Sequence, residues 1–109
     1  MINVLIKYKN NSIKSILVNG HANYADHGED IVCAAVSAIT QTTLLGLLDF
    51  LKDEITYEVS DGNLFFEIPE DLSEENSIKV DVLTKTLLIG LKNIKNNYNN
   101  YLYMKKEEV

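Results

Sequence analysis

The sequence predicts a single α+β domain in which a mostly antiparallel sheet carries two packed helices. Two pairs of short β-prone segments are each joined by a turn, and a long helical segment follows each pair. The 109 residues are 46% hydrophobic, which suffices for one core and gives no sign of a linker. The expected order over residues 1–109 is therefore ββαββα, with an optional last strand.

The first hairpin is expected at residues 4–8 and 13–18, which are β-prone runs separated by Lys9-Asn10-Asn11. A turn-forming, mostly polar stretch at residues 19–29 then predicts a loop long enough to cover a site. We expect this loop to be the most mobile part of the chain.

The first helix is expected from Asp30 to about Lys52, where the chain is apolar nearly all round. A helix of that composition is expected to be buried on most sides. Asp30 is a natural N-cap and places Cys33 at the third helical position. At about 100° per residue, one narrow face carries the polar side chains, and it is made of Asp30, Cys33, Ser37, Thr40 and Gln41.

The second hairpin is expected at residues 54–60 and 63–69, which flank the strong turn signal Asp61-Gly62. Ser73 is a candidate N-cap for a second helix whose first turn is acidic. Apolar residues at spacings of three and four define the buried face of that helix, namely Val80, Leu83, Leu87, Leu91, Ile94 and Tyr98. Residues 101–104 are the optional last strand.

Charge and composition exclude several classes of function. The net charge of −6 opposes direct nucleic-acid binding and favours a basic partner. The first residues lack a signal-peptide h-region, and no apolar run is expected to approach transmembrane length, so we expect a cytoplasmic protein without a membrane partner. Cys33 is the only cysteine, which agrees with a reducing compartment.

Cys33 and His21 are candidates for a nucleophile and a general base, because one loop connects them. A thiol in the first helical turn lies near unpaired N–H groups and the positive end of the helix dipole, which favour a thiolate. The same N–H groups are candidate donors to an oxyanion. The alternative is that Cys33 is an inert apolar residue, and spacing alone favours that alternative.

A metal site is not expected. His21, His27 and Cys33 recur every six residues, with Asp26 and Glu29 nearby, but this spacing matches no common zinc motif. His27 is interpreted as a solvated surface histidine.

The segment from Gly20 to Ile39 resembles the signature of the ribosomal-processing cysteine protease family Prp. The similarity is carried by Gly20-His21-Ala22, by Gly28 and by the run at residues 30–37. Members of that family remove a short N-terminal extension from a large-subunit ribosomal protein. The resemblance therefore implies one cysteine-protease domain over residues 1–109, no cofactor, a basic ribosomal protein precursor as the peptide substrate, and a homodimer.

By this resemblance Cys33 takes the position of the nucleophile and His21 that of the general base. Asp30 and Ser37 match the other polar positions of the family. Asp30 either orients His21 or only caps the helix. Ser37 either forms a hydrogen bond within the site or bonds back to its own helix. Gly20 and Gly28 are interpreted as hinges of the loop.

Our first hypothesis is thus a cysteine endopeptidase. One alternative is a non-enzymatic, ribosome-associated module that binds a peptide in the same cleft, in which case Cys33→Ala leaves the function intact. The other is a thiol redox sensor, which the lack of a second cysteine disfavours.

Overall fold

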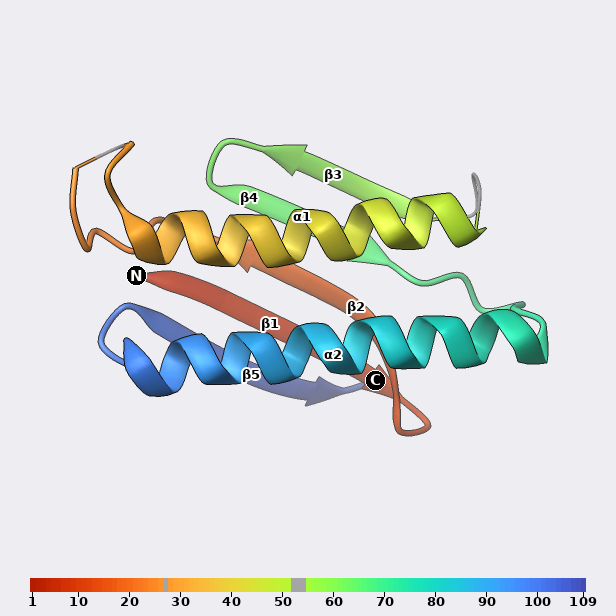
Figure 1. The fold of residues 1–109 in the computed structure, drawn as a ribbon. Helices are drawn as coiled ribbons and strands as arrows, with labels where there is room; N and C mark the ends of the chain where they lie inside the picture. Colours follow the sequence, from red (N-terminus) through yellow and green to blue (C-terminus); the bar gives the residue numbers. More distant parts are fainter. Residues whose placement is uncertain (27, 52–54) are drawn as a thin grey trace.

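The computed structural model of the chain describes residues 1–26, 28–51 and 55–109. Within these residues, a five-stranded sheet in the order β3-β4-β2-β1-β5 forms one layer, and two helices lie side by side on one of its faces (Figure 1). The element order is ββαββαβ, so the predicted fold class is confirmed. The predictions for His27, for the helix end near Lys52 and for the strand start at Glu54 fall outside the described residues.

The first hairpin consists of β1 (Ile2–Lys9) and β2 (Ser12–Asn19), which pair antiparallel. Asn10 and Asn11 connect them with φ angles of 54° and 66°. A two-residue hairpin turn of type I′ needs positive φ at both positions, and asparagine tolerates that conformation better than most residues. The turn therefore forms where the sequence predicts it.

The second hairpin consists of β3 (Thr56–Ser60) and β4 (Asn63–Glu67), and β4 also pairs antiparallel with β2. The optional last strand is present as β5 (Leu102–Glu108) and is longer than predicted. It pairs with β1 in parallel, which makes the sheet mixed. Between β4 and β5 the chain crosses back along the sheet through a helix. Strand β5 therefore runs in the same direction as β4 and β1.

The helices are α1 (Ile31–Leu51) and α2 (Glu74–Asn97). Ser73 caps α2 as predicted, since its side chain accepts a hydrogen bond from the N–H of Asn76. The core lies between the helices and the sheet and includes fully buried side chains from both layers, among them Ile6, Ile16, Phe66, Leu47 and Leu91.

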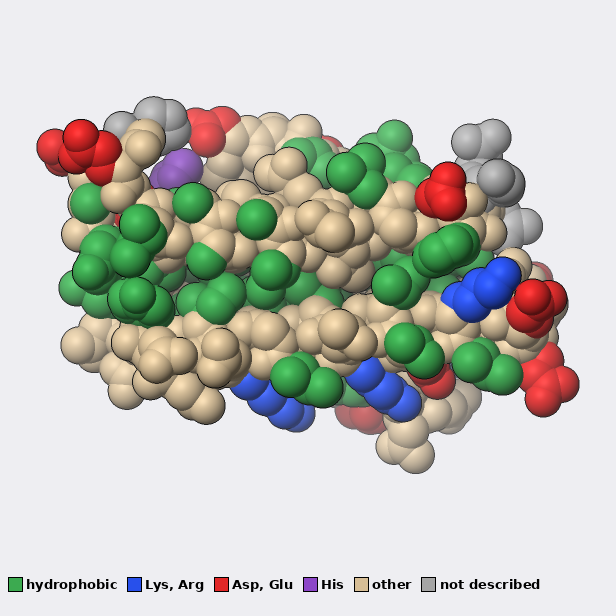
Figure 2. All heavy atoms as spheres, in the orientation of Figure 1, with side chains coloured by type: hydrophobic (Ala, Val, Ile, Leu, Met, Phe, Trp, Pro, Cys, Tyr) green, Lys and Arg blue, Asp and Glu red, His purple; other side chains and the backbone are tan. Residues whose placement is uncertain are grey.

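The prediction that α1 is buried on most sides is wrong. Its buried residues form one stripe, made of Val32, Val36, Thr40, Leu44, Leu47 and Leu51. On its outward side, Leu45 is 66% exposed and Ile31 is 53% exposed. Since α1 and α2 each cover part of the same sheet face, their outward sides face solvent, and hydrophobic side chains are visible there (Figure 2).

The length and composition of α1 would also allow it to span a membrane, and it is the one such helix among the described residues. The expectation that no apolar run approaches that length is therefore wrong for α1. The core helix of a water-soluble domain satisfies the same criterion, and α1 packs its buried stripe against the sheet through residues such as Val32 and Leu47. Length and composition are thus weak evidence for a membrane span.

Candidate active site

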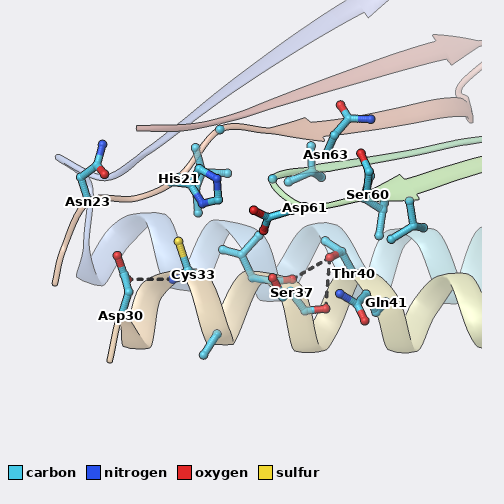
Figure 3. Close-up of a pocket in the computed structure, with 18 of the residues that line it drawn as sticks. His21, Asn23, Asp30, Cys33, Ser37, Thr40, Gln41, Ser60, Asp61 and Asn63 are labelled. Carbon is cyan, nitrogen blue, oxygen red and sulfur yellow. Dashed lines mark hydrogen bonds between the residues drawn. The ribbon is translucent and has the colours of Figure 1, made fainter. Parts of the chain in front are cut away.

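An open cavity of about 560 Å³ lies between the start of α1 and the β3–β4 hairpin (Figure 3). Three segments line it: the loop after β2, the first turns of α1, and the end of β3 with the start of β4. Its polar lining includes His21, Cys33, Ser37, Gln41, Asp61 and Asn63. The polar face that helical spacing predicts for α1 therefore faces this cavity.

Cys33 is the third residue of α1 and is partly buried. Its Sγ accepts a hydrogen bond from the N–H of Ala22 at 3.2 Å. Ala22 is only 3% exposed, so little water competes for that N–H. A negatively charged acceptor forms a stronger hydrogen bond than a neutral one, and this contact is therefore suited to a thiolate.

Asp30 caps α1 with one carboxylate oxygen and holds the preceding loop with the other. Its Oδ1 accepts hydrogen bonds from the N–H groups of Val32 and Cys33, each at 3.0 Å. Its Oδ2 accepts from the N–H groups of Tyr24 at 2.9 Å and Ala25 at 3.4 Å. One side chain thus ties the loop to the first turn of the helix, as the capping alternative predicts.

The same four donors keep Asp30 ionised. Partial burial acts to raise the pKa of its carboxyl group, but the N–H groups of Cys33, Tyr24, Ala25 and Val32 outweigh burial and hold the pKa below its usual value. The resulting negative charge lies at the N-terminus of α1, where the helix dipole stabilises it.

The Asp30 cap changes the expected source of an oxyanion hole. The N–H groups of Val32 and Cys33 already donate to the carboxylate, and the N–H of Ala34 donates to the backbone oxygen of Asp30 at 3.0 Å. These three N–H groups of the first turn are therefore engaged. The N–H of Ala22, by contrast, points at the sulfur itself.

His21 follows β2 and extends its exposed side chain into the cavity from the side opposite α1 (Figure 3). Asp61 enters the cavity from the adjacent β3–β4 turn (Figure 3). In the part of the chain that is described, no hydrogen bond joins His21 to Asp30 or to Cys33, so Asp30 does not orient the imidazole in this structure. Hydrogen bonds between catalytic groups are often loose before substrate binds.

Ser37 lies one turn beyond Cys33 and lines the cavity. Among the described residues its hydroxyl has no hydrogen-bond partner, while its backbone oxygen accepts a hydrogen bond from Thr40 Oγ1 at 3.3 Å. Neither predicted bond of this hydroxyl is therefore present. It remains free to meet a ligand.

The two loop glycines differ in their surroundings. Gly20 has φ +96°, and a Cβ atom there would collide with the backbone oxygen of Met1. Gly28 has φ +90°, and a Cβ atom there would meet nothing within 4 Å. Of the two, only Gly20 therefore occupies a tight position. At Gly28 the positive φ is the only feature that favours glycine. Their role as hinges stays a prediction.

The loop is also held at its outer side by aromatic contacts. Tyr24 packs edge-on against Tyr98 and Tyr101, with ring centroids 5.6 and 5.2 Å apart. Such pairs stabilise beyond the area that they bury. The loop that begins at His21 is therefore attached both to α1 and to the chain between α2 and β5.

Sequence reasoning missed the part that the β3–β4 turn plays in the site. Asp61-Gly62 was interpreted only as a hairpin signal, whereas a Cβ atom at Gly62 would lie 2.7 Å from Nε2 of His21. The turn reaches His21 because β4 pairs with β2. No local pattern in the sequence indicates that pairing.

A thiol at a helix start with an imidazole across an open cavity is an arrangement typical of cysteine hydrolases. Comparison with known proteins makes this specific. The family model described as "Cysteine protease Prp" matches residues 1–103. The chain therefore belongs to the Prp family of ribosomal-processing cysteine proteases, and it is a cysteine protease.

Relatives and solved structures agree with this assignment. The chain is 32% identical over 92 residues to the ribosomal processing cysteine protease Prp of Bacillus subtilis, covering 83% of this chain and 82% of that one. It is 33% identical over 92 residues to the Mycoplasma genitalium protein of the same name, covering 84% and 87%. The fold matches the crystal structure of Prp from Staphylococcus aureus with a covalently linked product peptide, with a TM-score of 0.85 at 22% identity over 98% of this chain and 100% of that one. It also matches SMU.848 from Streptococcus mutans, with a TM-score of 0.76 at 25% identity over 100% and 96%.

Proposed function

We propose that this protein removes the N-terminal extension of a large-subunit ribosomal protein, with Cys33 as the nucleophile and His21 as the general base and acid. The observation that carries the proposal is that these two side chains, from different elements, line one open cavity (Figure 3). The relatives named ribosomal processing proteases and the peptide bound by the Staphylococcus aureus structure support the substrate class. A net charge of −6 suits a basic ribosomal substrate.

In the proposed reaction, His21 takes the thiol proton and Cys33 Sγ attacks the carbonyl carbon of the scissile bond, moving one electron pair onto the carbonyl oxygen. The C–N bond then breaks, and His21 gives its proton to the leaving amine. Water attacks the resulting thioester while His21 accepts a proton from it. The C–S bond breaks as the carbonyl re-forms, His21 returns its proton to Cys33 Sγ, and the acid product leaves.

We assign the oxyanion donor to the N–H of Ala22. The oxyanion is two bonds from Sγ, and this N–H already lies 3.2 Å from the sulfur. The N–H groups of Val32 and Cys33 in the first helical turn are bound by the Asp30 carboxylate. A fixed backbone donor near the developing charge lowers the barrier because it needs no reorganisation during the reaction.

The proposal is tested by incubating a host large-subunit ribosomal protein precursor with the wild-type chain, with Cys33→Ala and with His21→Ala, followed by intact-mass spectrometry. We expect one N-terminal truncation with wild type and none with either variant. Circular dichroism of the variants controls for folding. Truncation by Cys33→Ala would contradict the proposal. Tight binding without truncation by any form would favour the peptide-binding module instead.

We also propose that the protein acts in the cytoplasm, where its ribosomal substrate is made, and that it forms a homodimer. The support for a dimer is the exposed apolar surface on the outward side of the helices, where Leu45 is 66% and Ile89 is 70% exposed (Figure 2). Sedimentation velocity of the wild type and of a Leu45→Lys, Ile89→Lys variant tests this. A monomeric wild type at micromolar concentration would contradict it.

A further inference from the structure

The β3–β4 turn, defined as Asp61 and Gly62, touches the imidazole of His21. A Cβ atom on Gly62 would lie 2.7 Å from Nε2, 3.1 Å from Cε1 and 3.4 Å from Cδ2 of that ring. Real Cβ atoms essentially never approach another heavy atom within 3.0 Å. A side chain at position 62 would therefore force the exposed imidazole to move away from the turn.

A backbone contact fixes the turn relative to the segment that carries His21. The N–H of Gly20, the residue just before His21, donates to the backbone oxygen of Gly62 at 2.9 Å. Asn19 and Asn63 are partners in the adjoining β2–β4 ladder. The backbone at His21 and the surface on which its ring rests thus belong to one hydrogen-bonded unit.

Asp30 and Cys33, which also line the cavity, do not form a hydrogen bond with the imidazole of His21. Both carboxylate oxygens of Asp30 accept hydrogen bonds from backbone N–H groups, and neither is bonded to the imidazole. Cys33 Sγ accepts from Ala22. Neither group is hydrogen-bonded to the imidazole in the described part of the chain, whereas the backbone of Gly62 lies beside the ring.

We propose that Gly62 is a positioning residue for the general base: because it lacks a side chain, it leaves the His21 imidazole the space to lie across the cavity from Cys33 (Figure 3). The inference rests on the proposed role of His21 in the reaction. A side chain at position 62 displaces the ring, and a displacement of about 1 Å at a catalytic group lowers the rate by about 10²-fold.

The test compares Gly62→Ala with Asn11→Ala, both in the full-length protein. The two alanines would occupy positions of similar positive φ, because φ is 70° at Gly62 and 66° at Asn11. Asn11 lies in the β1–β2 turn and does not line the cavity, so its variant reports the cost of the strained backbone alone. We expect both variants to lower Tm, and only Gly62→Ala to lower kcat by at least about tenfold, with KM changed by less than about threefold.

A third variant, Gly62→Asn, separates strain from contact. Asparagine tolerates positive φ but still carries a Cβ atom, so we expect it to recover Tm relative to Gly62→Ala without recovering kcat. This variant also keeps the test valid if Gly62→Ala does not fold. In NMR spectra, the Cε1–H signal of His21, identified by its loss in His21→Ala, should shift in both position-62 variants and not in Asn11→Ala.

Equal kcat values for Gly62→Ala and Asn11→Ala, or full recovery of kcat in Gly62→Asn, would overturn the positioning role. The His21→Ala variant keeps this outcome distinct from failure of the proposed function. If His21→Ala still cleaves the precursor, the assigned general base is wrong. If His21→Ala is inactive while Gly62→Ala is as active as Asn11→Ala, only the role of Gly62 is wrong.

Discussion

The two walls of the cavity hold their functional groups by different means. On the α1 side, directional hydrogen bonds fix Cys33: Asp30 accepts hydrogen bonds from four backbone N–H groups, and Cys33 Sγ accepts one from the N–H of Ala22. On the hairpin side, every residue of β3 is exposed, and the imidazole of His21 rests on the bare backbone of Gly62. The difference matches the two proposed tasks, because a nucleophilic sulfur needs a constant electrostatic environment whereas a general base and acid exchanges protons with several partners.

The largest effect is expected from removing the single backbone donor to the sulfur. Replacing Ala22 by lactic acid exchanges its N–H for an ester oxygen and leaves the side chain unchanged. This ester variant can be made by ligating two synthetic segments at the Val32–Cys33 bond, because Cys33 is the only cysteine. We expect kcat to fall about 10²-fold or more, as for the loss of one oxyanion donor elsewhere.

Two control proteins accompany this measurement. The ligated all-amide protein controls for the synthesis. An ester at Ala25 removes an N–H that donates to Asp30, not to the sulfur, and should cost less than about tenfold. Equal losses for the two esters would contradict the role of the Ala22 N–H. The rate at which iodoacetamide alkylates Cys33 at one fixed pH shows whether the ester makes the thiol less reactive. An unchanged rate attributes the loss of kcat to the missing oxyanion donor.

The Asp30 cap is expected to have the next largest effect, on stability. Asp30→Ala removes the acceptor for four backbone N–H groups and should lower the free energy of unfolding by about 1 kcal/mol or more. Asp30→Asn keeps an oxygen acceptor and a good N-cap and should lose less. Urea denaturation measures both. If the two variants are equally destabilised, the charge and not the cap geometry is what matters.

The charge of Asp30 should also appear in the pH dependence of stability. Because the folded-state pKa lies below the usual value, the carboxylate stabilises the fold above the unfolded-state pKa of about 3.9. This contribution is lost as the pH falls from there through the folded-state pKa. The difference in Tm between wild type and Asp30→Asn should therefore shrink on acidification from pH 6 to pH 2. A constant difference would contradict the lowered pKa.

Ser37 is expected to show the smallest effect. Its hydroxyl faces the cavity and has no hydrogen-bond partner among the described residues, so Ser37→Ala should change the free energy of unfolding by no more than about 0.5 kcal/mol. We expect kcat/KM for the precursor to change by less than about threefold, which is well below the tenfold change that about 1.4 kcal/mol would produce. A larger loss in kcat/KM with unchanged stability would show that Ser37 binds the substrate.

Local features of the site were predictable from the sequence. The cap residue Asp30, the placement of Cys33 at the third position of α1 and the polar face toward the cavity depend only on residues within a few helical turns. The expectation that first-turn N–H groups receive an oxyanion stays a prediction, although Asp30 binds two of these groups. Helix geometry predicts free N–H groups in the first turn, but it does not reveal that a carboxylate already binds them.

By itself, the sequence determined the elements, their order and their turns, because capping, positive φ at Asn10-Asn11 and hydrophobic spacing act between near neighbours in the chain. Tertiary structure alone decided which elements adjoin. Pairing of β4 with β2 brings Gly62 against His21, and sharing one sheet face with α2 leaves the outward side of α1 exposed. Such contacts depend on the sum of many weak interactions between distant segments, which no local pattern of residues records.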